Sequence, residues 1–359
     1  MTLPVVPPVR PMLAKATREL PTADGLLYEP KWDGFRCIVF RDGDDVILGS
    51  RNDKPLTRYF PELLGPIRDQ LPDRVVVDGE IVVVGAAGLD FDLLSQRIHP
   101  AESRVNRLAA ETPASFVAFD VLALGDDDLR GRPFAERRSM LVSLFGSARP
   151  PLHLTPSTDD PVVAADWFER FEGAGFDGVI AKPGAGGYEE NKRSQLKVKH
   201  LRTAEMVVAG YRPHKDGNGV GSMLLGLGGD DGRLHHVGVC SAFTAARRAE
   251  LVDELAPYER DGAVDHPWAA WGDAEAHAGG DQRMPGAPSR WSGQRELDWV
   301  PLRCELVVEV AYEGLQNGNR LRHPARFVRW RPDKSPAECR YDQLEQVAPA
   351  ELAELFDVG

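Results

Sequence analysis

The sequence has 359 residues, of which 42% are hydrophobic and 27% are charged, a composition typical of a soluble globular protein large enough for two domains. The net charge of −12 argues against a protein that coats nucleic acid indiscriminately, because non-specific affinity grows with the number of phosphates neutralised. No apolar run reaches the roughly 20 residues of a membrane span, and the N-terminus lacks the basic and apolar regions of a secretory signal. We therefore expect a cytoplasmic protein without a membrane partner.

The first part of the chain mixes strand and helix signals. Residues 35–41 and 46–50 alternate in polarity around Asp42-Gly43-Asp44-Asp45, which predicts a hairpin. Lys31 and Arg51 then lie at strand ends. Further strands are predicted at 75–84, 115–124 and 178–181, and helices at 60–71, 132–144 and 161–171. The pattern favours antiparallel sheets with packed helices, which is the α+β class.

The second part of the chain contains mainly short strand-like runs. Strands are predicted at 205–211, 223–227, 234–239, 305–312 and 327–331, with one helix at 244–255. Several strands and a single helix suit a small β-barrel of the OB type. We predict a first domain at 1–203 and an OB-fold domain at 204–359, with a Gly- and Pro-rich surface loop near 262–293. The four cysteines are scattered, so we expect neither disulfides nor a zinc site.

The tetrapeptide Lys31-Trp32-Asp33-Gly34 follows a short apolar stretch and offers an amine that can take a phosphoryl group. A lysine nucleophile must lose its proton near neutral pH, which requires partial desolvation and nearby positive charge. Asp33 can orient the amine or hold water on a metal, and Gly34 permits close backbone approach to a phosphate. The alternative for Lys31 is an ordinary solvent-exposed lysine.

Further polar motifs follow in order along the chain: Ser50-Arg51-Asn52, Asp78-Gly79-Glu80, residues 116–122, 177–182 and 196–199, and Arg331-Pro332-Asp333-Lys334. This ordered set resembles the nucleotidyltransferase motifs of ATP-dependent DNA ligases, a superfamily shared with RNA ligases and mRNA capping enzymes. Residues 11–14, 28–36 and 321–324 further resemble the short bacterial repair ligases and the ligase module of bacterial end-joining enzymes.

The resemblance implies a role for each matching residue. Lys31 would form the covalent lysyl-AMP, with Asp33, Lys197 and Lys199 completing the catalytic set. Glu29 would lie by the adenine, and Phe119 and Ile180 would cover its two faces. The remaining implied contacts are Arg51 and Glu80 with the ribose, Arg36 with AMP or the nick phosphate, Lys182, Lys197 and Lys199 with the α-phosphate, Glu80 and Asp177 with metal, and Arg331, Asp333 and Lys334 with pyrophosphate.

Four of these positions have ordinary structural alternatives. Phe119 lies in an apolar strand, where an aromatic side chain is commonly core. Asp177 stands where the family usually has glutamate, so a turn aspartate or a water-bridged metal contact is favoured over direct ligation. Lys197 and Lys199 alternate along a predicted strand and so face one side, either a pocket wall or a solvated edge. Arg137 and Arg138 resemble a further ligase element, which we assign to scaffold or DNA contact.

The function expected from this resemblance is an ATP-dependent DNA ligase that seals nicks in duplex DNA, acts in DNA repair and uses ATP with Mg²⁺ or Mn²⁺. We expect a monomer that works with DNA-repair proteins and whose second domain closes over the first about a hinge at residues 201–205. One alternative is an RNA ligase or a capping-type nucleotidyltransferase, which shares several of the motifs. Another is a non-catalytic single-strand-binding protein built on the OB-like barrel.

Overall fold

The computed structural model describes two compact units, of which the first is Met1–His200 and the second begins at Leu201. The predicted boundary between residues 203 and 204 lies close to this division. None of the described helices is long and apolar enough to cross a membrane. The structure describes the whole chain except residues 52–53, 86–87, 263, 270–298, 317–318 and 345–359, so most of the loop predicted near 262–293 lies outside the described residues.

The larger sheet of the first unit is seven-stranded and is buried on both faces. Val75 and Val77 of β5 point to one face, where they pack with Ile67 of α1, whereas Val76 points to the other face. The first face carries helices, and the second is covered by the N-terminal segment through residues such as Leu3. The sheet consists of β3 (Phe35–Asp42), β4 (Asp45–Ser50), β5 (Arg74–Gly85), β6 (Gly88–Leu89), β7 (Ala114–Leu124), β8 (Asp127–Asp128) and β9 (Leu152–Leu154).

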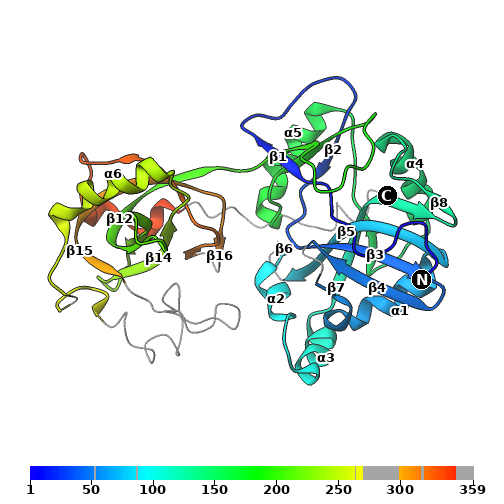
Figure 1. Cartoon of the computed structure of the whole chain (residues 1–359), viewed down its shortest axis with the longest axis horizontal. Coiled ribbons are helices and arrows are strands. Elements are labelled where there is room, and N and C mark those ends of the chain that lie inside the picture. Colours follow the sequence, from blue (N-terminus) through cyan, green and yellow to red (C-terminus); the bar gives the residue numbers. More distant parts are fainter. Residues whose placement is uncertain (52–53, 86–87, 263, 270–298, 317–318, 345–359) are drawn as a thin grey trace. The chain divides into compact units, whose positions relative to one another are not determined.

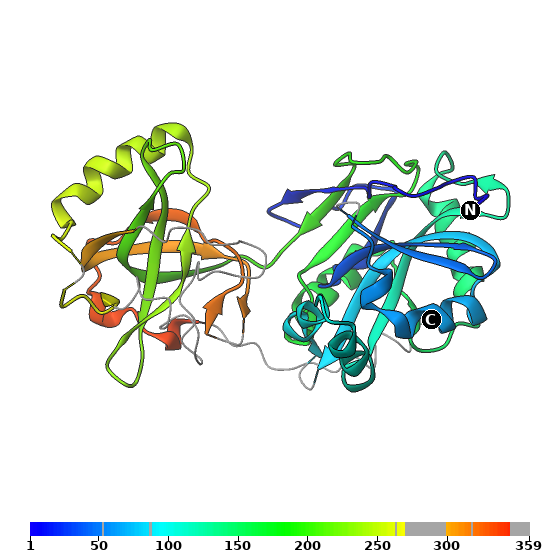
Figure 2. The same cartoon turned by 60° about the horizontal axis from the view of Figure 1, so that its bottom comes forward.

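The smaller sheet of the first unit is four-stranded, in the order β1-β11-β10-β2. Its apolar face packs against α5, where Tyr28, Val179 and Ala181 meet Ala164 (Figures 1 and 2). Because side chains alternate along a strand, the opposite face carries the other residues of these strands. The elements are β1 (Ala14–Thr17), β2 (Leu26–Pro30), β10 (Val179–Pro183) and β11 (Gln195–Val198), with the helices of the unit at α1 (Leu64–Gln70), α2 (Phe91–Gln96), α3 (Glu102–Glu111), α4 (Phe134–Phe145) and α5 (Pro161–Arg170).

The second unit is built on a five-stranded antiparallel sheet in the order β14-β13-β12-β15-β18. Helix α6 packs on the strands through Leu251 and Leu255, and Thr244 caps its first turn (Figure 1). Five strands with one helix are the arrangement expected for an OB-type barrel, which confirms the predicted α+β class. The elements are β12 (Arg202–Pro213), β13 (Val220–Gly228), β14 (Leu234–Cys240), α6 (Ala245–Leu255), β15 (Val300–Tyr312), β16 (Leu315–Gln316), β17 (Arg320–Leu321) and β18 (Arg326–Trp330).

Two predicted elements differ from the structure. The helix predicted over 60–71 is wrong at its start, where 3-10 turns at Thr57–Tyr59 and Pro61–Leu63 precede α1. Pro61 and Pro66 lack the N–H groups that a longer α-helix would need there. The strand predicted to carry both Lys197 and Lys199 ends at Val198, so Lys199 lies just beyond it.

Candidate active site

A cavity of about 200 Å³, open to solvent, lies in the first unit where the polar face of the smaller sheet meets the larger one. Most of the residues predicted to bind nucleotide line it: Glu29, Lys31, Arg36, Arg51, Glu80, Phe119, Ile180, Lys182 and Lys197. Pro11, Met12, Leu13, Ala14, Pro30, Trp32 and Gln195 complete the lining.

One wall of the cavity is a cross-strand row on the smaller sheet. Ile180 of β10 lies directly opposite Glu29 of β2 on one side and Lys197 of β11 on the other. Residues paired in this way share a face of the sheet, and Lys182 and Gln195 reach the same face by alternation along their strands. Sequence positions that are far apart therefore converge because of strand register.

The opposite wall contains Phe119, which lies at an irregularity in β7. Asp78 pairs with Asp120 and the next residue of β5, Gly79, pairs with Ala118, so Phe119 is an extra residue between two ladder pairs. A β-bulge of this kind redirects a side chain. Phe119 accordingly lines the cavity, and the Arg36 guanidinium lies 4.2 Å from its ring centroid.

Lys31 lies beside two further predicted residues, Asp177 and Lys199. The Lys31 ammonium is 2.5 Å from the Asp177 carboxylate, and the Lys199 ammonium is 2.8 Å from the same oxygen. Backbone bonds fix this arrangement, because Lys31 donates to the Gly178 carbonyl and Asp177 donates to the Lys31 carbonyl. Burial disfavours the charged form of Asp177, but the charges and hydrogen bonds of the two lysines outweigh it and lower the pKa of the carboxyl.

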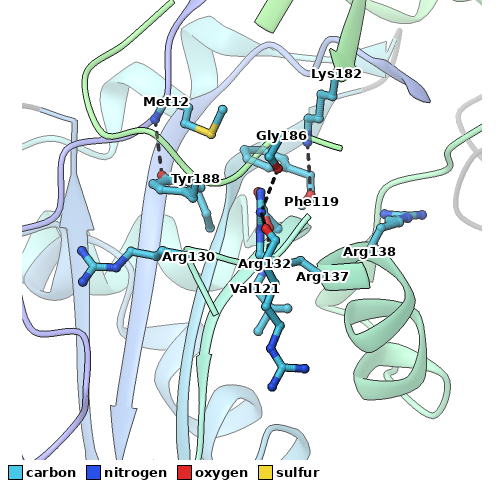
Figure 3. Close-up of polar contacts among 12 residues, drawn as sticks. Met12, Phe119, Val121, Arg130, Arg132, Arg137, Arg138, Lys182, Gly186 and Tyr188 are labelled. Carbon is cyan, nitrogen blue, oxygen red and sulfur yellow. Dashed lines mark hydrogen bonds and ion pairs between the residues drawn. The ribbon is translucent and has the colours of Figure 1, made fainter. Parts of the chain in front are cut away.

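A buried ion pair between Lys182 and Glu29 lies in the wall of the cavity. The two groups are 2.6 Å apart, and Lys182 also donates to the Phe119 carbonyl at 3.1 Å (Figure 3). Burial lowers the pKa of Lys182, although the charge of Glu29 opposes this shift. The strand that carries Phe119 is thus linked to the strand that carries Glu29.

Arg36 is supported from behind by two residues that the sequence analysis did not assign, Asp78 and Tyr188. Asp78 is fully buried and accepts two hydrogen bonds of 2.6 Å from the Arg36 guanidinium, and the Tyr188 hydroxyl donates to it at 2.6 Å. Asp78 stands two residues before Glu80, which is a local sequence signal, whereas nothing near Tyr188 indicates its partner. Burial raises the pKa of Glu80 to about 7, although the charges of Arg36 and Lys31 oppose the shift.

The structure gives a further explanation for glycine at position 34. A Cβ atom at this position would overlap the carbonyl oxygen of Ile81, so the close approach to β5 requires glycine.

Asp33 does not line the cavity. Arg331, Asp333 and Lys334 follow β18 in the second unit, where Arg331 pairs with Asp333 at 2.7 Å and with Glu205.

The carboxylates near Lys31 are a partial donor set for a divalent cation. Among the described residues, no group of three or more His, Cys, Asp or Glu side chains could hold a metal ion. Mg²⁺ is commonly bound by one or two carboxylates, with phosphate oxygens and water filling its other positions. Glu80 and Asp177 fit that partial role and not a closed metal site.

Comparisons with known proteins cover both units. A family model described as ATP dependent DNA ligase domain matches residues 11–199, and one described as ATP dependent DNA ligase C terminal region matches residues 216–334. DNA ligase C of Mycobacterium tuberculosis is 55% identical over 99% of each chain. The multifunctional non-homologous end joining DNA repair protein LigD of the same species is 30% identical over 87% of this chain and 37% of its own. A solved Lig E DNA ligase shares the fold, with a TM-score of 0.55 at 17% identity over 89% of this chain and 99% of that one.

Proposed function

The chain belongs to the ATP-dependent DNA ligases, and from this premise we propose that it seals nicks in duplex DNA through a covalent adenylate on Lys31 and that it acts in DNA repair. The observation that carries the proposal is the placement of Lys31 on the cavity lining, together with eight other residues predicted to act on the nucleotide. The similarity to LigD, a non-homologous end joining DNA repair protein, supports the repair role.

In the first step the Lys31 amine attacks the α-phosphorus of ATP. A nitrogen–phosphorus bond forms as the phosphorus–oxygen bond to pyrophosphate breaks. Asp177 orients the amine, and Lys199, bound to the same carboxylate oxygen, adds positive charge close to it. Lys197 supplies further charge for the phosphates from β11. Lys182, to which the resemblance gave a contact with the α-phosphate, is paired with the Glu29 carboxylate.

The cavity wall positions the adenosine so that the α-phosphorus meets Lys31. Phe119 and Ile180 cover the two faces of the base, and Glu29 lies at its edge. Glu80 and Arg51 contact the ribose hydroxyls. Holding the reactants in this way converts a bimolecular attack into an effectively unimolecular one.

In the later steps the adenylate passes to the 5′-phosphate at the nick, and the 3′-hydroxyl then attacks that phosphate and expels AMP. Arg36 contacts AMP or the nick phosphate, and Asp78 and Tyr188 hold its guanidinium for this contact. Asp33 acts with Lys197 and Lys199 in the same chemistry. Arg331, Asp333 and Lys334 of the second unit orient the pyrophosphate.

Glu80 and Asp177 would hold Mg²⁺ or Mn²⁺, Asp177 through water because its side chain is short and already accepts from two lysines. A bound divalent cation neutralises part of the phosphate charge. We further propose that the protein is a cytoplasmic monomer that works with DNA-repair proteins.

The test is incubation with α-labelled ATP and, separately, α-labelled GTP. The wild-type chain should acquire label from ATP, and Lys31→Ala should acquire none. Lys192→Ala is the matched control, because this lysine is 70% exposed and its ion pair is with the nearby Glu189. Label retained by Lys31→Ala would overturn the assignment of the nucleophile.

A chase separates the substrate classes. Labelled protein is mixed with nicked duplex DNA or nicked duplex RNA in the absence of free ATP. Loss of label to DNA, with appearance of sealed strands, is expected. Transfer to RNA alone would favour the RNA ligase alternative, and labelled protein that transfers to neither would contradict ligation.

A further inference from the structure

Helix α4 sends two consecutive arginines to two different carboxylates. Arg137 is fully buried and makes paired hydrogen bonds of 2.8 and 2.9 Å to Asp120, the residue after Phe119. It also donates to the carbonyls of Arg132 and Gly186 (Figure 3). Arg137 therefore anchors the helix to β7, and it is not among the residues that line the cavity.

Arg138 points away from Arg137, since successive helical residues are about 100° apart (Figure 3). Its side chain is 11% exposed and lies 3.9 Å from the carboxylate of Glu29. A second guanidinium nitrogen donates to the Thr155 carbonyl at 2.5 Å. Thr155 in turn accepts a 2.8 Å bond from the indole of Trp32, the neighbour of Lys31. One guanidinium nitrogen of Arg138 is thus held by the Thr155 carbonyl, and another faces Glu29.

Glu29 is held between two cations. One oxygen of its carboxylate is 2.6 Å from Lys182, and the other is the one nearest Arg138. That second oxygen and the facing Arg138 nitrogen are both buried, and within the described part of the chain neither has a hydrogen-bond partner. A separation of 3.9 Å is too long for a hydrogen bond but keeps the charges close. Small movements of Glu29 are therefore resisted from both sides.

We propose that Arg138 is a positioning residue that fixes the carboxylate of Glu29 and thereby sets the preference for adenine over guanine. The inference rests on the proposed function, in which Glu29 lies at the edge of the base. Glu29 lines the cavity and Arg138 does not, so Arg138 acts through Glu29. Adenine presents an amino donor at C6, where guanine presents a carbonyl acceptor. A carboxylate fixed at that edge accepts a hydrogen bond from the adenine amino group and repels the guanine carbonyl.

The buried position of Arg138 is costly unless it serves a contact. Burial lowers the pKa of its guanidinium, and the charges of Glu29 and Asp120 only partly offset the shift. Arg137 already anchors the helix through four hydrogen bonds. A second buried arginine is therefore not needed to dock α4, and its remaining charged neighbour in the cavity wall is Glu29.

The experiment compares matched substitutions at neighbouring arginines and measures KM and kcat for adenylate transfer to the protein. Arg138→Met should raise the KM for ATP about tenfold, lower the preference for ATP over GTP about tenfold, and leave kcat at saturating ATP within about threefold. Arg138→Lys should give an intermediate preference. Arg132→Met, at an arginine whose side chain is 47% exposed, should change neither parameter.

A double-mutant cycle tests the route through Glu29. If Arg138 acts on Glu29, Arg138→Met should have no further effect on the ATP-to-GTP ratio in a Glu29→Gln protein. An unchanged ratio in Arg138→Met, or equal effects with and without Glu29, overturns the inference. If Arg138→Met does not fold, the same ratio measured on Arg138→Lys decides. A wild-type protein that takes no label at all refutes the proposed function as well, whereas normal labelling with unchanged Arg138 variants refutes the inference alone.

Discussion

The two ends of the cavity use the same pair of chemical groups in different surroundings. At the base end, which is the end proposed to hold the adenine base, Lys182 and Glu29 are 2.6 Å apart and only 5% and 4% exposed. At the reacting end, Lys31 and Asp177 are 2.5 Å apart but 21% and 19% exposed. The distances are nearly equal, so the difference lies in solvent access and in the number of partners.

The difference in solvent exposure suits the two ion pairs to different roles. A buried pair is costly to break, because removal of one partner leaves an uncompensated charge. Lys182 and Glu29 therefore form a fixed part of the cavity wall. Asp177 instead divides its interaction between Lys31 and Lys199 and remains open to solvent, so the Lys31 amine can leave it when phosphate arrives.

The largest expected effect tests whether the two lysines at Asp177 are equivalent. Lys31→Arg keeps a cation beside Asp177 but removes the amine, so adenylate transfer should fall by at least about 10³-fold. Lys199→Arg keeps the nucleophile and should retain labelling within about tenfold. Both are measured as label acquired from α-labelled ATP. Equal losses in the two variants would contradict the assignment of Lys31 as the nucleophile.

The second effect tests the fixed wall. Lys182→Met leaves Glu29 buried with its closest cation removed, so we expect a loss of about 3 kcal/mol in unfolding free energy and an increase in the KM for ATP. Denaturant unfolding and adenylation kinetics measure the two quantities. Lys192→Met, at an exposed lysine, is the control and should change neither. An unaltered stability of Lys182→Met would show that the two ends of the cavity do not differ as described.

Much of this fold was predictable because apolar alternation is a local property. The strands β3, β5 and β7 were found from their own residues, since one or both faces of each are buried. Helices α2 and α3 were not found. Helix α3 is mostly polar, and its buried residues are Val105 and Leu108. Short β1 likewise gave no signal, because it pairs with a partner distant in sequence.

The residues of the candidate site also differ in whether a local sequence pattern identifies them. Residues such as Lys31, Glu80 and Lys182 were predicted because each lies within a short ordered motif, and the cavity brings them together. Tyr188 was missed because its partner, Asp78, is 110 residues away and no local pattern records the pairing. Arg138 was assigned only to scaffold or DNA contact, since its proximity to Glu29 depends on how α4 docks.

The third expected effect concerns the carboxyl of Glu80, which lines the same cavity. The pKa of this carboxyl is raised from 4.5 to about 7 by burial, so the folded state holds a proton that the unfolded state releases. Its stabilising contribution is complete below about pH 4.5 and is lost as the pH rises through about 7. Glu80→Gln should therefore gain stability relative to wild type, by about 3 kcal/mol, as the pH increases across this window.

Denaturant unfolding at several pH values, without nucleotide or metal, measures this difference. Glu136→Gln replaces an exposed glutamate on α4 and serves as the control. A pH dependence that is the same for both variants would indicate that Glu80 is not protonated in the folded protein. Its environment would then resemble the reacting end more closely than the base end.

The smallest effect tests the support behind Arg36. Tyr188→Phe removes one hydroxyl that donates to Asp78 and accepts from the Met12 amide, leaving the paired bonds between Arg36 and Asp78 in place. We expect a stability loss of about 1 kcal/mol and a change in adenylation rate of less than about threefold. Thermal unfolding and label transfer measure these. Asp78→Asn should cost more stability, because it weakens the paired hydrogen bonds that hold the Arg36 guanidinium. A larger effect from Tyr188→Phe would place the main support of Arg36 at the tyrosine instead.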